Sequence, residues 1–376
     1  MEYRVIDISS KEGYKELTIP MNSIIFDVAV IGAGVSGLTC AQQLQKAGYN
    51  VIVLDKSRGV GGRMATRRVS GTRADHGVRY LEPKGELLQE LIQQLITCEP
   101  LENKLQVWTN TLYEFKQNQL QPQAISQPYY IMPSGMSTVG KIMADGLNIQ
   151  LNSRVESVTI TTENNWQCHI ELTDKNNPEL PEIVTAKSLV IAIPAPQALM
   201  LLESSNIEFK SIFLNLIKSV DYEPCITVIA GYSKEHNPDI PDWKAVTLSD
   251  DPILAWVGID SSKRLHPTQP VFVIQSNSNF AQQYLEASDL NAVGQKLIDQ
   301  AANTLLPWLD TPEWMQIHRW RYAFCRTPLS ISCLTNTTPL PLVCAGDWCG
   351  GNQIEGSLKS GIDAANWLQN QPHLKR

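Results

Sequence analysis

Three glycines near the start of the chain have the spacing needed to hold the phosphates of a dinucleotide. Gly32, Gly34 and Gly37 form a GxGxxG pattern directly after the apolar run 24–31. The first glycine permits a tight turn, the second lets the backbone approach a pyrophosphate, and the third lets helix and strand pack closely. Asp55 ends a second apolar run, where a carboxylate can accept hydrogen bonds from a ribose diol. The pattern predicts dinucleotide binding; the alternative is a glycine-containing turn between core elements.

The residues after Asp55 favour FAD over NAD. A second glycine pair, Gly61 and Gly62, precedes Arg63, and the segment DHGVRYL begins at Asp75. Near the end, residues 344–365 have the pattern of another buried strand, glycine turn and helix. An NAD dehydrogenase has no obvious use for a second phosphate-binding device of this kind so far downstream, whereas FAD does. We therefore predict FAD as the cofactor.

The elements that position these residues alternate between strand and helix periodicity. We expect a parallel βαβ unit over residues 24–55, because a strand, a glycine turn, a helix through Ala47 and a second strand follow in order. Further helices are expected at 86–96, 134–147, 211–219 and 289–306 and after residue 356, and further strands at 149–160, 166–174, 188–193, 225–232, 253–260, 271–278 and 340–345. Dinucleotide-type elements thus occupy both ends and the middle, with a mixed β region inserted.

Composition excludes several classes of protein. The 376 residues are 43% hydrophobic and 18% charged, which predicts an ordinary globular chain of two domains. The net charge of −7 and the scattered cations argue against nucleic acid as a partner. The first twenty residues lack a signal-peptide core, and prolines interrupt the apolar run 189–202, so no membrane span is expected and the location is predicted to be cytoplasmic.

The eight cysteines lie far apart and show no CxxC spacing. This pattern is typical of buried small side chains in a reducing compartment, so neither a disulfide framework nor a metal site is expected. Cys349, in the segment GDWCGG, is interpreted as a buried thiol rather than a covalent link to the flavin, so the FAD is predicted to be noncovalent.

The combined motifs resemble those of the FAD-dependent amine-oxidase superfamily: GxGxxG, the acid, GGRM, DxGxxY, a C-terminal GD and an EGS-type helix start. Within it, the chain is most similar to the renalase family, from residue 24 to 368. The resemblance implies an α/β fold, with an FAD-binding Rossmann domain like that of glutathione reductase and p-hydroxybenzoate hydroxylase and an inserted mixed β-sheet substrate domain. The expected boundaries are 22–83, 135–200 and 339–372 for the FAD-binding domain, 84–134 and 201–338 for the substrate domain, and 1–21 for an N-terminal extension.

The resemblance also assigns roles to individual residues. Ser36 and Arg63 would contact the pyrophosphate, Asp55 the adenosine ribose, the Val155 backbone the adenine, and Asp347 the ribityl or phosphate oxygens. A helix starting near Gly356 to Leu358 would point its amides at the flavin pyrimidine edge, where negative charge grows on reduction. The full predicted FAD-contact set is Gly32, Gly34, Ser36, Gly37, Asp55, Lys56, Gly62, Arg63, Met64, Gly77, Arg79, Tyr80, Val155, Gly346, Asp347, Gly356, Ser357 and Leu358.

Aromatic residues suggest where the substrate binds. Trp256, Trp320, Trp348 and His76 are the candidates for a pocket over the flavin, the alternative being core packing. The renalase resemblance implies oxidation of 2- and 6-dihydro isomers of NAD(P) to NAD(P)+, with hydride transfer to flavin N5 and reoxidation by O2 to hydrogen peroxide. No catalytic side chain is assigned, because hydride transfer requires stacking geometry rather than a base.

Alternatives remain at this point. Amine oxidases of the superfamily usually carry a lysine near flavin N5, and the segment 221–232 where we would expect it contains none. A flavin electron carrier acting with a protein partner is a third possibility. Arg319, Arg321, Lys263 and Arg264 are candidates to bind substrate phosphates, and the sequence does not rank them.

Overall fold

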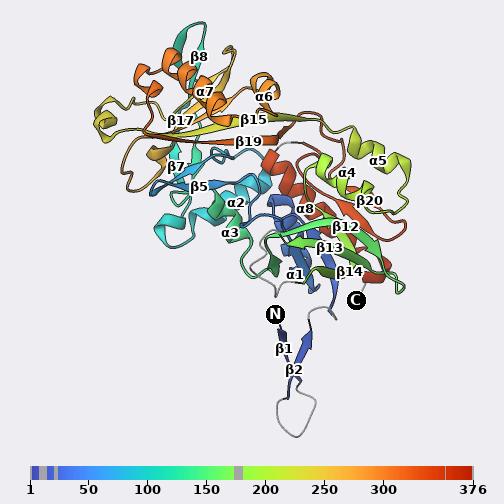
Figure 1. Cartoon of the computed structure of the whole chain (residues 1–376). Coiled ribbons are helices and arrows are strands. Elements are labelled where there is room, and N and C mark those ends of the chain that lie inside the picture. Colours follow the sequence, from blue (N-terminus) through green and yellow to red (C-terminus); the bar gives the residue numbers. More distant parts are fainter. Residues whose placement is uncertain (1, 8–14, 21–23, 173–180, 352, 375–376) are drawn as a thin grey trace. The chain divides into compact units, whose positions relative to one another are not determined.

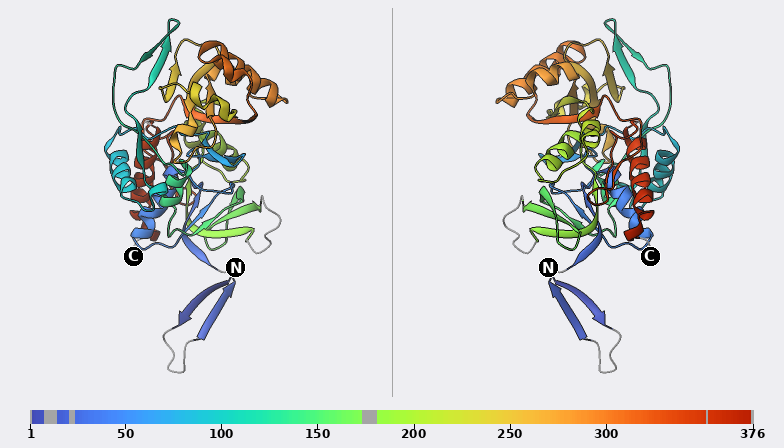
Figure 2. Two further views of the ribbon diagram at one scale, coloured as in Figure 1. Left: turned by 90° about the vertical axis from the view of Figure 1, so that its left-hand side faces the viewer. Right: turned by 90° about the vertical axis from the view of Figure 1, so that its right-hand side faces the viewer.

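A computed structural model describes residues 2–7, 15–20, 24–172, 181–351 and 353–374 (Figure 1). Within the predicted N-terminal extension, β1 (Glu2–Asp7) and β2 (Lys15–Pro20) pair with each other as an antiparallel ribbon (Figure 2). Among the described residues, no helix has the length and apolar character needed to cross a membrane.

The chain divides into two compact units, and each is built from separated segments. Unit 1 comprises residues 1–62, 143–220 and 327–376, and unit 2 comprises 63–142 and 221–326. Residues 63–83, which the sequence analysis grouped with FAD binding, are therefore part of unit 2. The assignment of one domain to FAD and the other to substrate stays a prediction.

Unit 1 contains the predicted βαβ element. β3 (Ile25–Ile31) leads through the glycine loop into α1 (Val35–Lys46), and β4 (Val51–Leu54) then pairs with β3 in parallel. The strand order is β11-β4-β3-β14-β13-β12, and β14 (Ile183–Ile191) is also parallel to β3. This arrangement confirms the predicted α/β fold with a Rossmann-type half.

The rest of unit 1 completes this sheet and covers it. β14 pairs in parallel with β21 (Leu342–Cys344), and α8 (Gln353–Gln369) packs on α1. The other elements of unit 1 are β11 (Ile149–Gln150), β12 (Ser153–Ile160), β13 (Trp166–Leu172), α4 (Ala195–Glu203), α5 (Ser211–Lys218), β20 (Leu334–Asn336) and the 3-10 helix η6 (Pro372–Leu374). The expected single strand 149–160 is interrupted, because Asn152 has a left-handed backbone with φ of 56°. The last two residues of the expected strand 166–174 lie outside the described residues.

Unit 2 is built on a sheet of strand order β19-β15-β18-β17-β16-β8-β9. These strands are β19 (Trp314–Cys325), β15 (Tyr222–Gly231), β18 (Val271–Ser276), β17 (Leu254–Ile259), β16 (Ala245–Leu248), β8 (Tyr113–Lys116) and β9 (Gln119–Pro122). Neighbours are antiparallel except β8 and β16, which are parallel and join the two segments of the unit. This sheet matches the predicted inserted β region.

Smaller elements surround the sheet of unit 2. The hairpin of β5 (Thr66–Val69) and β6 (Thr72–Asp75) was not predicted, and the expected helix 134–147 is shortened to α3 (Ser137–Met143). The remaining elements are β7 (Gln106–Thr109), β10 (Tyr129–Ile131), α2 (Glu86–Ile96), α6 (Ser278–Tyr284), α7 (Leu290–Thr304) and the 3-10 helices η2 (Leu101–Asn103), η3 (Lys234–Asp239), η4 (Asp260–Lys263) and η5 (Pro307–Asp310).

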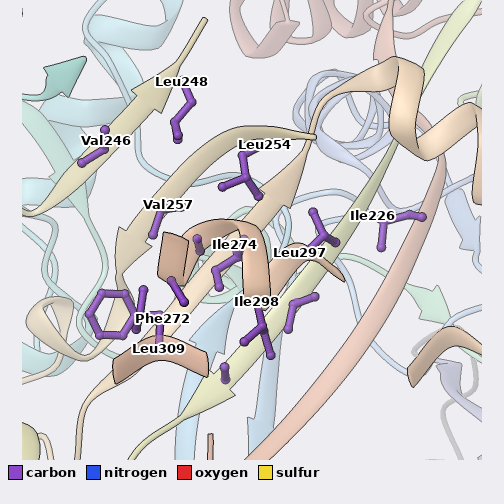
Figure 3. Packing of buried hydrophobic residues seen from close by; sticks show 14 of the residues in the cluster. Ile226, Val246, Leu248, Leu254, Val257, Phe272, Ile274, Leu297, Ile298 and Leu309 are labelled. Carbon is purple, nitrogen blue, oxygen red and sulfur yellow. The ribbon is translucent and has the colours of Figure 1, made fainter. Parts of the chain in front are cut away.

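The core of unit 2 lies where α7 packs on the sheet (Figure 3). Leu297 and Ile298 of α7 contribute fully buried side chains to the same cluster as Ile226 of β15 and Ile274 of β18. Burying side chains of this size contributes about 1.5–3 kcal/mol each. This packing therefore fixes the positions of the strands and of the polar residues at their ends.

Candidate functional site

The glycine loop of unit 1 has the geometry that each glycine was predicted to provide. Gly32 has a φ of 109°, and a Cβ there would lie 2.5 Å from the Ala192 carbonyl oxygen. A Cβ on Gly37 would lie 2.0 Å from the Gly32 carbonyl oxygen, whereas one on Gly34 would meet no atom within 4 Å. Gly32 and Gly37 are therefore required for packing, and Gly34 leaves the backbone open to an approaching ligand.

The first turn of α1 carries a hydroxyl suited to a phosphate. Ser36 is buried, and its Oγ has no hydrogen-bond partner within the described residues. Gly34 caps the helix without a side chain, and its first turn holds no acidic residue, so the amide end of the helix keeps its positive polarity. An unpaired buried hydroxyl beside such amides fits the pyrophosphate of FAD.

The second glycine pair lies against the first loop. The Gly61 amide donates to the Ala33 carbonyl at 2.8 Å, and a Cβ on Gly62 would sit 3.3 Å from the Gly34 Cα. The Gly62 φ of 57° is one that glycine adopts without strain. The two glycine motifs, separate in sequence, therefore form one local structure.

Asp55 follows β4, as predicted, and it also braces the loop. Its Oδ2 accepts from the Ala33 amide at 2.7 Å, and its Oδ1 accepts from the Ser57 amide at 2.8 Å. Each oxygen retains a second lone pair for a ribose hydroxyl. Lys56 is exposed and Val155 is half-buried on β12, and their contact with FAD stays a prediction.

The C-terminal motif follows β21 and leads into α8. The Gly346 amide donates to Ser360 Oγ at 2.9 Å, and Asp347 is buried. Trp348, a predicted pocket residue, is fully buried in unit 1, where its indole N–H donates to the Ile193 carbonyl at 3.1 Å. The structure therefore gives Trp348 a packing role, and a place beside the substrate stays a prediction.

The helix start at this motif differs from the expectation. α8 begins at Gln353, so the predicted contacts Gly356, Ser357 and Leu358 follow its first residues. The hydroxyl of Ser357 donates to the Gln353 carbonyl at 2.7 Å. Gly350 and Gly351, both with positive φ, precede the helix, and its first residue Gln353 also has a positive φ, of 48°.

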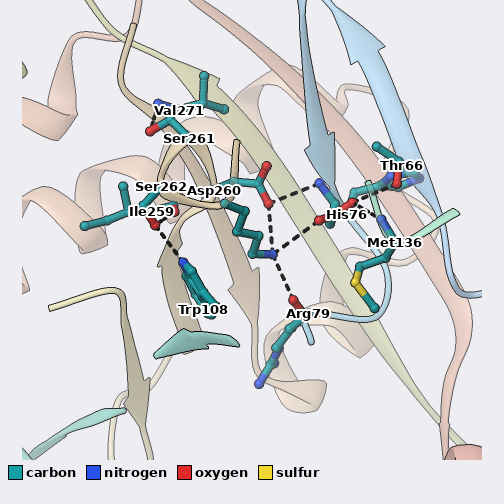
Figure 4. Close-up of polar contacts among 12 residues, drawn as sticks. Thr66, His76, Arg79, Trp108, Met136, Ile259, Asp260, Ser261, Ser262 and Val271 are labelled. Carbon is teal, nitrogen blue, oxygen red and sulfur yellow. Dashed lines mark hydrogen bonds and ion pairs between the residues drawn. The ribbon is translucent and has the colours of Figure 1, made fainter. Parts of the chain in front are cut away.

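Unit 2 contains a buried ion cluster, part of which is drawn in Figure 4. We define it as Asp75, Asp260, Lys263 and Arg264. Lys263 Nζ is 3.0 Å from Asp260 Oδ1 and 3.5 Å from Asp75 Oδ2, and Arg264 contacts both carboxylates, at 2.9 Å from Asp75. Burial alone would raise the pKa of Asp75, but Arg264 and Lys263 lower it below its ordinary value.

This ion cluster corrects one interpretation of the sequence. Lys263 and Arg264 were candidates for substrate phosphates, yet both cations are bound to carboxylates of their own unit. Arg319 and Arg321, the other two candidates, donate to the Leu285 carbonyl and to Glu286. The contacts with Asp75 join distant parts of the chain, whereas Asp260, three and four residues before the two cations, is a partner that the local sequence could have indicated.

Arg79 is a cation held by neutral groups. Its Nε donates to Gln275 Oε1 at 2.6 Å, and its guanidinium lies 4.9 Å from the ring centroid of Trp256. Trp256 is fully buried, and its indole N–H has no partner within the described residues. Tyr80 packs edge-on to Tyr129 at 4.8 Å, and burial raises its pKa to about 12. Predicted residues Arg79, Tyr80 and Trp256 thus belong to one unit, and Gln275 was missed.

His76, His318 and Trp320 form a three-ring cluster. His76 stacks on Trp320 at 5.4 Å, and His318 lies 4.4 Å from Trp320 and 4.8 Å from His76. The Trp320 indole donates to the His76 carbonyl at 2.8 Å. Burial lowers the pKa of both histidines to about 4, and the charge of Arg67 adds to this; at His76 the charge of His318 contributes as well. Both imidazoles are therefore neutral at pH 7.

Gly77, which follows His76 of the three-ring cluster, packs closely against Arg63 of the GGRM motif. A Cβ on Gly77 would lie 2.0 Å from the Arg63 carbonyl oxygen, so only glycine fits there. Arg63 donates to the Ala323 carbonyl of β19 at 3.1 Å, and Met64 is fully buried. Gln275 Nε2 lies 3.5 Å from the carbonyls of His76 and Gly77, which connects this segment to Arg79.

The family models match almost the whole chain. A model described as NAD(P)-binding Rossmann-like domain matches residues 30–95, and one described as flavin containing amine oxidoreductase matches residues 97–368. The chain belongs to the flavin containing amine oxidoreductase family. This confirms the predicted superfamily, with FAD as cofactor, and the predicted class of FAD-dependent oxidoreductase.

Curated relatives match over short segments. The L-amino-acid oxidase of Echis ocellatus is 37% identical over 87 residues, 23% of this chain and 16% of that protein. The L-amino acid oxidase of Cerastes cerastes is 33% identical over 95 residues, 25% of this chain and 17% of that protein. A candidate flavin-containing monoamine oxidase of Mycobacterium tuberculosis is 39% identical over 69 residues, 18% of this chain and 15% of that protein. The chain thus spans less than a fifth of the length of these relatives.

Solved structures match over nearly the full length. A putrescine oxidase structure bound to putrescine has a TM-score of 0.68 at 15% identity, covering 93% of this chain and 100% of that one. Cyclohexylamine oxidase from Brevibacterium oxydans has a TM-score of 0.66 at 14% identity, covering 94% and 100%. At such identities the likeness establishes the fold.

All eight cysteines are free thiols, and burial raises the pKa of Cys349 well above its ordinary value. No group of three or more His, Cys, Asp or Glu side chains within the described residues is placed to hold a metal ion.

Proposed function

We propose that the chain is a renalase-like, FAD-dependent oxidase that converts 2- or 6-dihydro isomers of NAD(P) to NAD(P)+. When bound, FAD supplies a hydride acceptor at N5, and its two electrons then reduce O2 to hydrogen peroxide. The residues of this chain need only bind the dihydropyridine ring, hold it in one orientation and exclude water. No proton has to be removed from the substrate carbon.

The neutral three-ring cluster carries this proposal. His76 and Trp320 are stacked on each other and His318 lies edge-on to both. Both imidazoles are neutral, since their pKa values are about 4, so the half-buried Trp320 belongs to an uncharged aromatic surface. Such a surface suits stacking of a dihydropyridine. The indole N–H of Trp320 donates to the backbone carbonyl of His76, and this hydrogen bond holds the rings in place.

The charges near these rings favour an anionic substrate over an amine. Arg79 lies in the same hydrogen-bonded group, through Gln275, and no carboxylate within the described residues forms a salt bridge with it. An ammonium about 4 Å from such a cation would be repelled by roughly 1 kcal/mol in water and 4 kcal/mol near a protein surface. A nucleotide would be attracted instead.

The strand examined for an amine-oxidase lysine supports the same substrate. β15 is described in full, and its residues Tyr222–Gly231 include no lysine. Lys263, which follows β17 closely in sequence, is buried, and its Nζ is paired with the carboxylates of Asp75 and Asp260 in the ion cluster.

An amine is the second candidate substrate, because the family is that of flavin containing amine oxidoreductases and one structural neighbour is a putrescine oxidase. For this reading, Trp256 and Tyr80 would supply the aromatic groups that receive the amine carbon chain. The repulsion from Arg79 is the argument against it.

Anaerobic absorbance spectroscopy of the FAD-loaded protein separates the two candidates. We expect 6-dihydro-NAD(P) to bleach the flavin band rapidly and a primary amine to leave it unchanged. Trp320→Phe should slow the bleaching, whereas Trp308→Phe, in a separate aromatic cluster with Tyr232 and Phe272, should not. Bleaching by the amine alone, or by neither compound, would overturn the proposal.

A further inference from the structure

An open pocket with basic and amide side chains lies beside the three-ring cluster in unit 2. Its volume is about 420 Å³, and it is lined by Arg67, Arg68, Asn291, Met315, Gln316 and Ile317. The lining residues include two arginines, an asparagine and a glutamine, and none of them is acidic. This set of donors matches an anion rather than a cation.

The two arginines are available to a ligand. Arg67 and Arg68 are exposed on β5, and neither forms a salt bridge or a side-chain hydrogen bond within the described residues. Lys263 and Arg264, in contrast, are paired with carboxylates in the ion cluster. Guanidinium groups left unpaired in a concave site are well suited to bidentate contact with phosphate.

The pocket and the rings share one strand face and one hairpin. Gln316, His318 and Trp320 are every second residue of β19, so their side chains lie on the same side of the strand. Each is about 6.8 Å along the strand from the next. Arg67 is paired with Ala74 across the β5–β6 hairpin, two residues before His76. Its charge also helps to lower the pKa of both His76 and His318, so it lies near the ring pair.

We propose that this pocket is the phosphate subsite of the substrate, with Arg67 and Arg68 binding the phosphate of a nicotinamide nucleotide whose ring stacks at His76 and Trp320. The distance along β19 from Trp320 to Gln316, about 13 Å, is within the reach of a nucleotide's ribose and phosphates. This inference rests on the proposed function, since it assumes a dihydronicotinamide ring at the three-ring cluster.

Three substrates with the same reacting ring test the subsite. Anaerobic reduction of the FAD-loaded protein would be followed with the 6-dihydro forms of nicotinamide riboside, nicotinamide mononucleotide and NAD, which carry zero, one and two phosphates. The variants are Arg67→Gln, Arg68→Gln and the double variant. Lys116→Gln, an exposed residue at the end of β8, removes the same charge elsewhere in unit 2.

We expect each arginine substitution to raise the apparent Kd of both phosphorylated substrates about fivefold, the double variant more, with an unchanged limiting rate of flavin reduction. The riboside should not respond to the substitutions, and Lys116→Gln should alter none of the three. Equal effects on the riboside and the mononucleotide, or no effect on either, would overturn the phosphate subsite while leaving the proposed oxidation intact.

Direct binding keeps the two proposals distinguishable. If no dihydronicotinamide reduces the flavin, the proposed function fails, and calorimetry with inorganic pyrophosphate then tests the pocket alone. Binding that weakens in the double variant but not in Lys116→Gln would support an anion site here. Absence of binding to the unsubstituted protein would refute it.

Discussion

Replacing Lys263 by methionine tests whether the ion cluster stabilises unit 2. The side chains of Lys263, Asp75 and Asp260 are fully buried, and that of Arg264 is 8% exposed, so the four charges balance out of contact with water. Lys263→Met keeps the length of the side chain but leaves one buried negative charge uncompensated. Breaking a buried pair in this way costs about 3–5 kcal/mol. For a unit of this size, the melting temperature should fall by roughly 6–20 °C.

Urea denaturation of the FAD-loaded protein, followed by tryptophan fluorescence, measures this loss. The ring centroids of Trp108 and Trp256 lie 5.1 and 6.0 Å from Lys263 Nζ, so two of the nine tryptophans that give the signal are beside the site. Adding Asp260→Asn to Lys263→Met restores neutrality, and the combined loss should be smaller than the sum of the two single losses. Lys84→Met, which breaks an exposed pair with Glu82, serves as the comparison. A Lys263→Met loss no greater than that of Lys84→Met would refute the reasoning.

Three further outcomes follow from the described geometry. Gly37→Ala should lower the melting temperature and the bound FAD together, because its Cβ would lie 2.0 Å from the Gly32 oxygen; Gly34→Ala, with open space around its Cβ, should fold normally but bind FAD about tenfold more weakly. Equal melting temperatures for the two variants would contradict this. Ser36→Ala should weaken FAD binding without loss of stability, since Ser36 Oγ has no partner among the described residues; equilibrium dialysis measures the affinity, and an unchanged value would argue against a phosphate contact. The depressed pKa of His76 means that the unfolded chain binds more protons between about pH 4 and 6.5. Stability should therefore fall, by up to about 3 kcal/mol from this group, as the pH drops from 6.5 to 4. His76→Asn should remove that part of the slope in urea titrations, and an identical slope would be evidence against a neutral His76.

The sequence predicted the glycine loop and its flanking elements well, because their requirements are local. β3, α1 and β4 follow from hydrophobic periodicity, the φ of 109° at Gly32 is a property of its own backbone, and the clash that a Cβ would cause at Gly37 comes from the nearby Gly32 carbonyl. The same holds for Asp55, which directly follows its strand. Family membership could be predicted for a related reason, since these short motifs carry it.

The ion cluster and the three-ring cluster of unit 2 could not be predicted in full, because many of their contacts join distant parts of the chain. Lys263 and Arg264 were candidates for a phosphate site, yet they are paired both with Asp260, which is close in sequence, and with Asp75, which lies 188 and 189 positions away. The contact of His318 with His76 depends on how β19 packs against the segment that follows β6. Two available arginines, Arg67 and Arg68, received no assignment because nothing in their local sequence distinguishes them from paired ones.

The discontinuity of both units constrains the order in which a growing polypeptide can fold. The antiparallel pairing of β19 with β15 completes the sheet of unit 2 once residue 325 has been synthesised. Unit 1 must wait for β21 and α8, since β21 pairs with β14 and α8 packs on α1 beside Ser36. Vectorial synthesis therefore favours unit 2 first, and the dinucleotide loop becomes rigid only when the last helix is released. Cofactor capture is thereby coupled to the synthesis of α8: a chain truncated at residue 326 and released from the ribosome should protect unit 2 from proteolysis but retain no FAD, and FAD retention by this chain would contradict the order.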